Sequence, residues 1–205
     1  AAAAAEAARI DAEYTPDRLK ALIANDVLDS YSLRGHRNML DIAGGEGVFA
    51  SAAAQRWPHL EVTLLDLPPV AERARERFVA AGLARRAHAI GGDLFAATNL
   101  EGFDLVSLVR VVHDHDDPAV ATMLQTAHRA LRPGGTLLIA EPMAGTTGAE
   151  PVGDAYFGLY LWAMGSGRPR TAAELAAMAR RAGFTRCREL GTSQPLLVRV
   201  LVAGP

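Results

Sequence analysis

The most informative part of the sequence for the fold is the stretch Leu40-Asp-Ile-Ala-Gly-Gly-Glu-Gly47. It joins a short apolar run at 39–43 to a helical pattern at 48–56, so it predicts a strand, a glycine-rich turn and a helix. Such a turn lets a ligand approach the backbone amides at the N-terminus of the helix. Many glycine-rich turns are merely tight, so the rest of the chain has to decide its meaning.

From residue 38 onward, short apolar runs alternate with longer amphipathic stretches. The expected strands are 39–43, 62–66, 87–90, 104–112, 136–140, 185–190 and 196–203, and the expected helices are 48–56, 69–82, 118–131 and 172–182. This alternation predicts an α/β fold, a mostly parallel sheet with helices on both faces. The last two runs lie close together and predict an antiparallel pair. Thr15-Pro16 is expected to start a further helix, and Thr171 with Glu174 to cap the last one.

Composition excludes several classes of protein. The chain has 205 residues, of which 50% are hydrophobic and 21% charged, which suits one globular domain. Its 21 basic and 23 acidic residues give a net charge of −2, so no basic excess points to nucleic acid. Lys20 is the only lysine, which we interpret as coding bias. Cys187 is the only cysteine, which excludes an intrachain disulfide and a cysteine-based metal site. The start carries no basic region typical of a signal peptide, and no apolar run is long enough to span a bilayer, which favours a cytoplasmic protein.

Acidic residues follow three successive expected strands. Asp41 lies in the first, Asp66 ends the second, and Asp93 follows the third in Gly91-Gly-Asp-Leu-Phe95. The carboxyl ends of parallel strands meet at one edge of the sheet, where ligands bind. An acid at the end of the second strand is placed to bind a ribose diol. Together these residues indicate a nucleoside-containing ligand.

The next two expected strands end in His113-Asp-His-Asp-Asp117 and in Glu141. Both ends lie at the same edge, so His113 and Glu141 are expected to be neighbours. A carboxylate behind a histidine orients the imidazole and makes it a better base. A metal site is disfavoured, because Pro118 follows where a His-x-His-x-Asp metal pattern would require another histidine.

These motifs, in this order, resemble the class I S-adenosylmethionine-dependent methyltransferases, specifically the small-molecule O-methyltransferases. The resemblance covers about residues 30 to 205 and implies a Rossmann-like, doubly wound seven-stranded sheet with an antiparallel last strand. It implies His113 as the general base and Glu141 as the carboxylate that orients it, with Asp114 a further catalytic residue beside either the base or the cofactor. It implies S-adenosylmethionine as cofactor and S-adenosylhomocysteine as product. The expected binding residues are Asp41, Ala43, Gly44, Gly45, Gly47, Asp66, Leu67, Asp93, Leu94 and Arg110.

Three stretches, which begin at Val109, Ala140 and Ala163, are similar to the carotenoid 1-hydroxyl O-methyltransferases of purple phototrophic bacteria, which act on hydroxyneurosporene or demethylspheroidene. The chain departs from the wider family pattern at Ala43, at His115 (usually tryptophan) and at Pro169 (a glutamate in plant phenol methyltransferases). The family also has an N-terminal helical domain. Residues 1–35 are expected to be its remnant or a linker from it, 36–205 the catalytic domain, and the full-length protein a homodimer.

An aromatic-rich stretch is expected to line the pocket of a lipophilic small-molecule acceptor. Its proposed lining residues are Tyr156, Phe157, Tyr160 and Met164. A core or dimer-interface helix explains the same pattern equally well. A lipophilic acceptor implies peripheral contact with the photosynthetic membrane. Three alternatives stay open: a phenolic or polyketide acceptor, an inactive cofactor-binding module, and a dehydrogenase, which leaves the acids after the third and fourth strands without a role.

Overall fold

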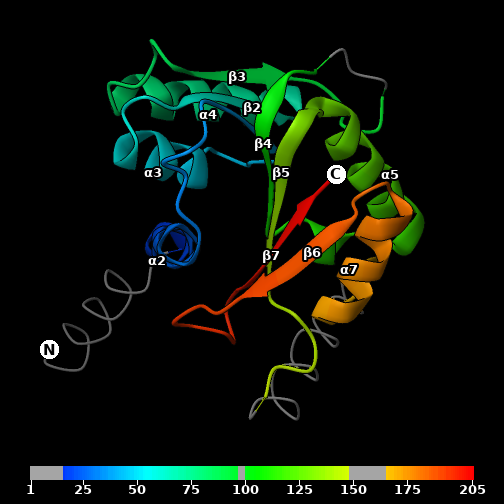
Figure 1. Cartoon of the computed structure of the whole chain (residues 1–205). Helices are drawn as coiled ribbons and strands as arrows, with labels where there is room; N and C mark the ends of the chain where they lie inside the picture. Colours follow the sequence, from blue (N-terminus) through cyan, green and yellow to red (C-terminus); the bar gives the residue numbers. More distant parts are fainter. Residues whose placement is uncertain (1–15, 97–99, 148–164) are drawn as a thin grey trace, which may run out of the picture.

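The computed structural model of the chain describes residues 16–96, 100–147 and 165–205 (Figure 1). Its helices are α2 (Pro16–Ser30), α3 (Val48–Arg56), α4 (Pro68–Ala80), α5 (Asp117–Ala130) and α7 (Ala172–Arg181), with a 3₁₀ turn at Val112–Asp114. Its strands are β1 (Asn38–Ile42), β2 (Glu61–Asp66), β3 (Ala87–Gly91), β4 (Phe103–Val109), β5 (Leu131–Glu141), β6 (Arg186–Leu190) and β7 (Arg199–Gly204). The expected alternation of strands and helices is confirmed.

The strands of the described part form one seven-stranded sheet in the order β3-β2-β1-β4-β5-β7-β6. The strands from β3 to β5 in this order pair in parallel. Strand β7 runs antiparallel to both of its neighbours, β5 and β6. The mostly parallel sheet with an antiparallel last strand is therefore confirmed. The chain order reverses between β1 and β4, and a ligand crevice is expected beyond the carboxyl ends of these two strands.

Two helical layers cover the sheet. Helices α2, α3 and α4 lie on one face, and α5 and α7 lie on the other (Figure 1). The first layer buries Val27, Phe49 and Phe78 against the strands, and the second buries Val120 and Leu175. Helix α2 thus shares its core with α3, α4 and the strands of the sheet. None of the helices in the described ranges is long and apolar enough to cross a membrane.

Strand β4 is shorter than the sequence predicts. It was expected to run to Val112 but ends at Val109, because Arg110 has a left-handed backbone (φ 55°) that turns the chain out of the sheet. The backbone N–H groups of Val111 and Val112 then donate to the side chain of Glu141, at 2.8 and 2.7 Å, instead of to a strand. The apolar run therefore continues as a turn that faces the end of β5.

Strand β7 also begins later than expected, at Arg199 rather than at Leu196. The backbone N–H groups of Leu197 and Val198 both donate to the carbonyl of Gln194, at 2.9 and 3.0 Å. These residues form a turn, so they are unavailable for pairing with β5.

Candidate active site

The turn between β1 and α3 passes through the left-handed region of the backbone. Ala43 (φ 53°), Gly45 (59°) and Gly47 (77°) all have positive φ, which glycine adopts easily and alanine does not. Gly44 is required for a different reason, because a Cβ there would lie 2.4 Å from Oδ2 of Asp41. The backbone of the turn is thus packed closely over the end of β1.

Asp41 is a buried carboxyl group with one unpaired oxygen. Its Oδ1 accepts a hydrogen bond of 2.6 Å from the hydroxyl of Ser107 on β4. Its Oδ2 has no hydrogen-bond partner among the residues that the structure describes. Burial raises the pKa of Asp41 to about 7, the Ser107 bond opposes this rise, and the negative charge of Asp66 adds to it. A buried polar atom without a partner is costly, and a cationic ligand group would satisfy it.

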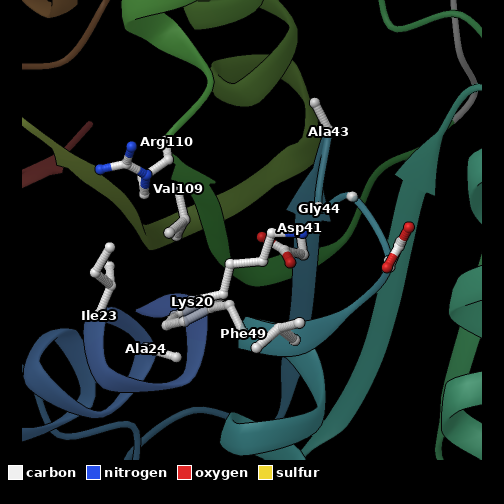
Figure 2. Close-up of a pocket in the computed structure, with 12 residues that line it drawn as sticks. Lys20, Ile23, Ala24, Asp41, Ala43, Gly44, Phe49, Val109 and Arg110 are labelled. Atoms are coloured by element: carbon white, nitrogen blue, oxygen red, sulfur yellow. The ribbon is translucent and has the colours of Figure 1, made fainter. Parts of the chain in front are cut away.

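A hollow of about 210 Å³ opens beside Asp41, between α2, the glycine turn and the end of β4 (Figure 2). Its charged lining consists of Asp41, Lys20, Glu46 and Arg110. Figure 2 shows Lys20 on the α2 side, across the hollow from Asp41. The guanidinium of Arg110 also donates to the carbonyl of Leu197 at 3.1 Å. The hollow therefore offers both an acid and cations to a ligand.

A second hollow, of about 170 Å³, lies beyond the ends of β2 and β3. It is lined by Asp66, Leu67, Asp93, Leu94, Phe95 and His115, among others. Ala43 lines both hollows, so they meet at the glycine turn. The rings of Phe95 and His115 pack edge to face with centroids 5.7 Å apart. Together the two hollows suit an elongated ligand with a charged end and a flat, mostly apolar end.

Asp66 connects the second hollow to the glycine turn. Its Oδ2 accepts from the backbone N–H of Gly45 at 2.8 Å, and its Oδ1 from that of Leu67 at 2.7 Å. Each oxygen keeps a further lone pair for a ligand. Asp93 accepts from the N–H of Phe95 at 2.9 Å.

Gly47 is the one predicted cofactor residue that lines neither hollow. It is the N-cap of α3, and a Cβ at this position would lie 2.9 Å from the ring of Phe78. Its glycine is thus explained by close packing of the helix.

His113 and Glu141 lie in contact, as their positions at two strand ends predict. Nδ1 of His113 and Oε2 of Glu141 are 2.5 Å apart, and both side chains are more than 90% buried. The other oxygen of Glu141 accepts from the N–H groups of Val111 and Val112. Nε2 of His113 lies 3.3 Å from Oδ1 of Asp114, which is half-exposed.

These partners assign the proton on the neutral ring of His113. A carboxylate that already accepts two backbone N–H groups can only accept from the ring, so Nδ1 carries the hydrogen and Nε2 keeps its lone pair. In this tautomer Nε2 carries no hydrogen and can accept a proton, with Oδ1 of Asp114 3.3 Å away. No group of three or more histidine, cysteine, aspartate or glutamate side chains that could hold a metal occurs within the described ranges.

Some site residues escaped the sequence analysis, and others cannot be placed. Lys20 lines the first hollow although its helix precedes the alternating pattern, and its being the only lysine was the one available signal. Ser107 reads in the sequence as an interior strand residue, and only the fold brings it to Asp41. The four proposed acceptor-lining residues, Tyr156, Phe157, Tyr160 and Met164, lie outside the described residues.

The O-methyltransferase domain family matches residues 5–185. The chain belongs to this family. The resemblance to the O-methyltransferases that the motifs predicted is therefore confirmed.

Individual relatives in the O-methyltransferase family agree. The chain is 37% identical to the demethylspheroidene O-methyltransferase of Cereibacter sphaeroides, over 89% of this chain and 48% of that protein. Its structure is similar to that of mitomycin 7-O-methyltransferase (TM-score 0.82, 30% identity, 90% and 54% of the chains covered). It is also similar to an O-methyltransferase of neocarzinostatin biosynthesis, solved with S-adenosylmethionine and 2-hydroxy-5-methyl naphthoic acid (TM-score 0.74, 27%, 89% and 51%). The chain spans about half the length of these relatives.

Proposed function

We propose that this chain carries the catalytic site of an S-adenosylmethionine-dependent O-methyltransferase, with His113 as the general base. The observation that carries the proposal is the contact between His113 and Glu141 at the edge of the sheet where both hollows open. Proton acceptor and ligand site thus lie at the ends of neighbouring strands. An inactive cofactor-binding module would have no use for a buried histidine held in this way.

The residues of the two hollows fit S-adenosylmethionine. The unpaired Oδ2 of Asp41 is an acceptor for an ammonium group, and Lys20 lies across the hollow as a partner for a carboxylate. Gly44 leaves room beside the carboxyl of Asp41 that a Cβ would fill. Asp66 is placed to accept from ribose hydroxyls, and the lining of the second hollow by Leu94 suits an adenine ring. When bound, S-adenosylmethionine supplies an electrophilic methyl group on a positively charged sulfur.

The side chains of the chain itself position the acceptor and remove its proton. In the proposed mechanism, Nε2 of His113 would accept the hydroxyl proton as the oxygen of the acceptor attacks the methyl carbon. The methyl–sulfur bond would break, and S-adenosylhomocysteine would leave as the product. Glu141 fixes the ring through Nδ1 and stabilises the imidazolium that results. Asp114, 3.3 Å from Nε2, is placed to stabilise the same positive charge. A base of this kind contributes about 10²–10⁴-fold, and most of the remaining rate comes from positioning.

For the acceptor we propose the tertiary 1-hydroxyl of an acyclic carotenoid, in carotenoid biosynthesis. The support is the identity of 37% to a demethylspheroidene O-methyltransferase. A tertiary alcohol is a weak acid, so its proton would leave during the attack and not before it. A phenolic hydroxyl is the second candidate, because a solved relative binds a hydroxynaphthoic acid.

The organisation of the whole protein is part of the same proposal. We propose that residues 36–205 form the catalytic domain, that 1–35 belong to a helical segment next to it, and that the full-length protein is a homodimer. The residues Tyr156, Phe157, Tyr160 and Met164 are proposed to line the acceptor pocket. A lipophilic acceptor would bring the protein into peripheral contact with a membrane.

A mass-shift assay tests the proposal. The chain is offered S-adenosylmethionine with equal amounts of a 1-hydroxy carotenoid and a catechol in mild detergent. Addition of one methyl to the carotenoid alone supports the proposed acceptor, whereas methylation of the catechol alone would overturn it and keep the mechanism.

The base is tested with two histidine variants. His113→Ala is expected to slow turnover by about 10²-fold or more, with little change in the Kd of S-adenosylmethionine. His59→Ala is the matched control, because His59 is exposed and precedes β2 at the opposite end of that strand. Equal turnover in His113→Ala and His59→Ala would refute the assignment of the base.

A further inference from the structure

Arg170 is a buried arginine that the mechanism so far does not use. Its side chain is 1% exposed. Its guanidinium donates to the carbonyl of Val112 at 2.9 Å, to the carbonyl of His115 at 2.8 Å, and to Oδ1 of Asp117 at 2.7 and 3.0 Å. A further bond, of 3.3 Å, goes to the carbonyl of Arg168. The buried charge is thus neutralised by Asp117 and fully hydrogen-bonded, as a buried arginine requires.

These acceptors flank the proposed base on both sides. The carbonyl of Val112 belongs to the peptide group that precedes His113, and His115 follows two residues after it. The same turn is held from the other direction, because the N–H of Val112 donates to Glu141. Arg170 and Glu141 therefore bind the same short turn, Arg170 through the carbonyl of Val112 and Glu141 through its N–H group.

The backbone of Arg170 also contacts the segment that follows Glu141, the carboxylate partner of His113. The carbonyl of Arg170 accepts from the N–H of Ala144 at 3.0 Å, three residues after Glu141. Gly167, with φ 83°, packs against the turn so closely that a Cβ would lie 2.2 Å from the carbonyl oxygen of His113. Its N–H donates to Asp116 at 3.0 Å. Residues 165–171 thus form a strap over the catalytic turn, and Arg170 joins the ends of β4 and β5.

We propose that Arg170 is a positioning residue that holds His113 in register with Glu141. The inference rests on the proposed function of His113 as the base. The hydrogen bonds of Arg170 to the turn around His113 do not depend on that function. The rigid fork of a guanidinium can reach two carbonyls and a carboxylate at once, which a lysine ammonium cannot do. The strap sets where the ring nitrogen points, and it touches neither hollow.

The test follows the ring proton of His113 directly, so it needs no acceptor substrate. In the ¹⁵N-histidine-labelled chain, the Nδ1–H resonance is assigned by its loss in His113→Gln. Arg170→Met is expected to speed exchange of this proton with water by about ten-fold or more, because the turn opens locally. The Kd of S-adenosylmethionine, measured by calorimetry, is expected to stay within about two-fold, since positioning and binding are separate. Arg170→Lys is expected to restore only part of the protection.

Arg168→Met is the matched control. Arg168 also bonds to Asp117, at 3.2 Å, and is 42% exposed, but its side chain donates to neither Val112 nor His115. The substitution removes one positive charge beside Asp117 and is expected to leave the ring proton as it is. The proposal would be overturned if Arg168→Met and Arg170→Met changed the exchange rate of the ring proton equally. It would also be overturned if Arg170→Met left that rate unchanged.

A second variant covers the case in which Arg170→Met does not fold. Gly167→Ala keeps every donor of Arg170 but presses a methyl group against the carbonyl of His113. Gly167→Ala is expected to speed exchange of the ring proton of His113. An unchanged exchange rate in this variant would contradict the proposed role of residues 165–171. Where the carotenoid is turned over, both variants are expected to lower kcat by about 10- to 100-fold, less than full loss of the base. Should His113→Ala keep its turnover, the proposed function fails while the exchange result still decides the role of Arg170.

Discussion

Asp41 allows a quantitative prediction about pH. Its carboxyl group is completely buried, and burial raises its pKa from the ordinary value of 3.8 to about 7. The charged groups that line the hollow beside it are Lys20, Glu46 and Arg110, and Asp66 lies nearby. The folded chain therefore holds a proton here at a pH where the unfolded chain has released it.

The sign of the effect on stability follows from this difference. Below about pH 3.8 the carboxyl is protonated in both states, and its contribution is fully present. As the pH rises towards 7, the unfolded state loses its proton first, so the free energy of unfolding falls. The pKa values of 3.8 and about 7 correspond to a total loss of about 4 kcal/mol, since one pKa unit is worth 1.36 kcal/mol. This is a large part of the roughly 5–15 kcal/mol that stabilises a typical domain.

Urea unfolding at pH 5 and pH 8 measures the part of this loss that falls between those two values. That part is about 2.6 kcal/mol, because the unfolded state is already mostly ionised at pH 5. Asp41→Asn keeps an acceptor for Ser107 and cannot ionise, so it is expected to remove the slope that Asp41 contributes between pH 4 and 7. Asp26→Asn is the control, because Asp26 is also buried but accepts from the N–H groups of Ser193 and Gln194 at 2.7 and 2.8 Å. It is expected to lower stability at every pH and keep the slope. A slope that survives in Asp41→Asn would refute the reasoning.

Cofactor affinity should show the same titration. A cationic group that binds the ionised carboxyl of Asp41 must displace its proton below pH 7, so binding of S-adenosylmethionine strengthens as the pH rises. At pH 6 the carboxyl is about nine-tenths protonated, and the Kd is expected to be about ten-fold higher than at pH 8. Calorimetry at the two pH values measures this ratio. Equal affinities, or the same ratio in Asp41→Asn, would show that Asp41 does not receive the cation.

Three further variants test the hollows. Asp66→Ala should raise the Kd of S-adenosylmethionine by about ten-fold or more, because charge-assisted bonds to the ribose and to Gly45 are lost together; calorimetry with unchanged affinity would remove Asp66 from the site. Lys20→Met should raise the same Kd by no more than about five-fold, since Lys20 is half-exposed and exposed ion pairs are weak; a larger effect would mean that Lys20 does more than pair with a carboxylate. Ala43→Gly should raise the free energy of unfolding by up to about 1 kcal/mol, as relief of left-handed strain exceeds the added entropy of the unfolded chain; urea unfolding that shows a loss would contradict this.

The parts of the fold that depend on local pattern could be predicted from the sequence. The glycine turn after β1 was recognised from its residues, and the capping box of α7 from Thr171 and Glu174, whose reciprocal bonds are both present. The end of β4 could not be predicted, because the run Val-Arg-Val-Val at 109–112 is compatible with a strand as well as with a turn. Beyond the left-handed turn at Arg110, the chain is held by the carboxylate of Glu141, about 30 residues further along, which accepts from the N–H groups of Val111 and Val112.

The residues of the site also differ in how far the sequence predicts them. His113 and Glu141 could be paired in advance, because parallel strands bring their carboxyl ends to one edge. Arg170 could not be linked to them, since nothing in Gly-Arg-Pro-Arg indicates which carbonyls a buried guanidinium would meet. Lys20 was missed because α2 precedes the first strand, and only its packing in the layer of α3 brings it to the hollow.

Backbone strain supports the location of the site independently of any relative. Within the described ranges, Ala43 and Arg110 are the non-glycine residues with positive φ, at 53° and 55°. They follow β1 and β4, the two neighbouring strands where the chain order reverses, and both line the first hollow. A left-handed residue with a side chain costs about 1–2 kcal/mol and persists where the surrounding structure imposes it. The first hollow also holds the unpaired oxygen of Asp41. Two strained turns and one unsatisfied carboxyl at a single place lower stability without improving the core, so we infer that a bound ligand is what they serve.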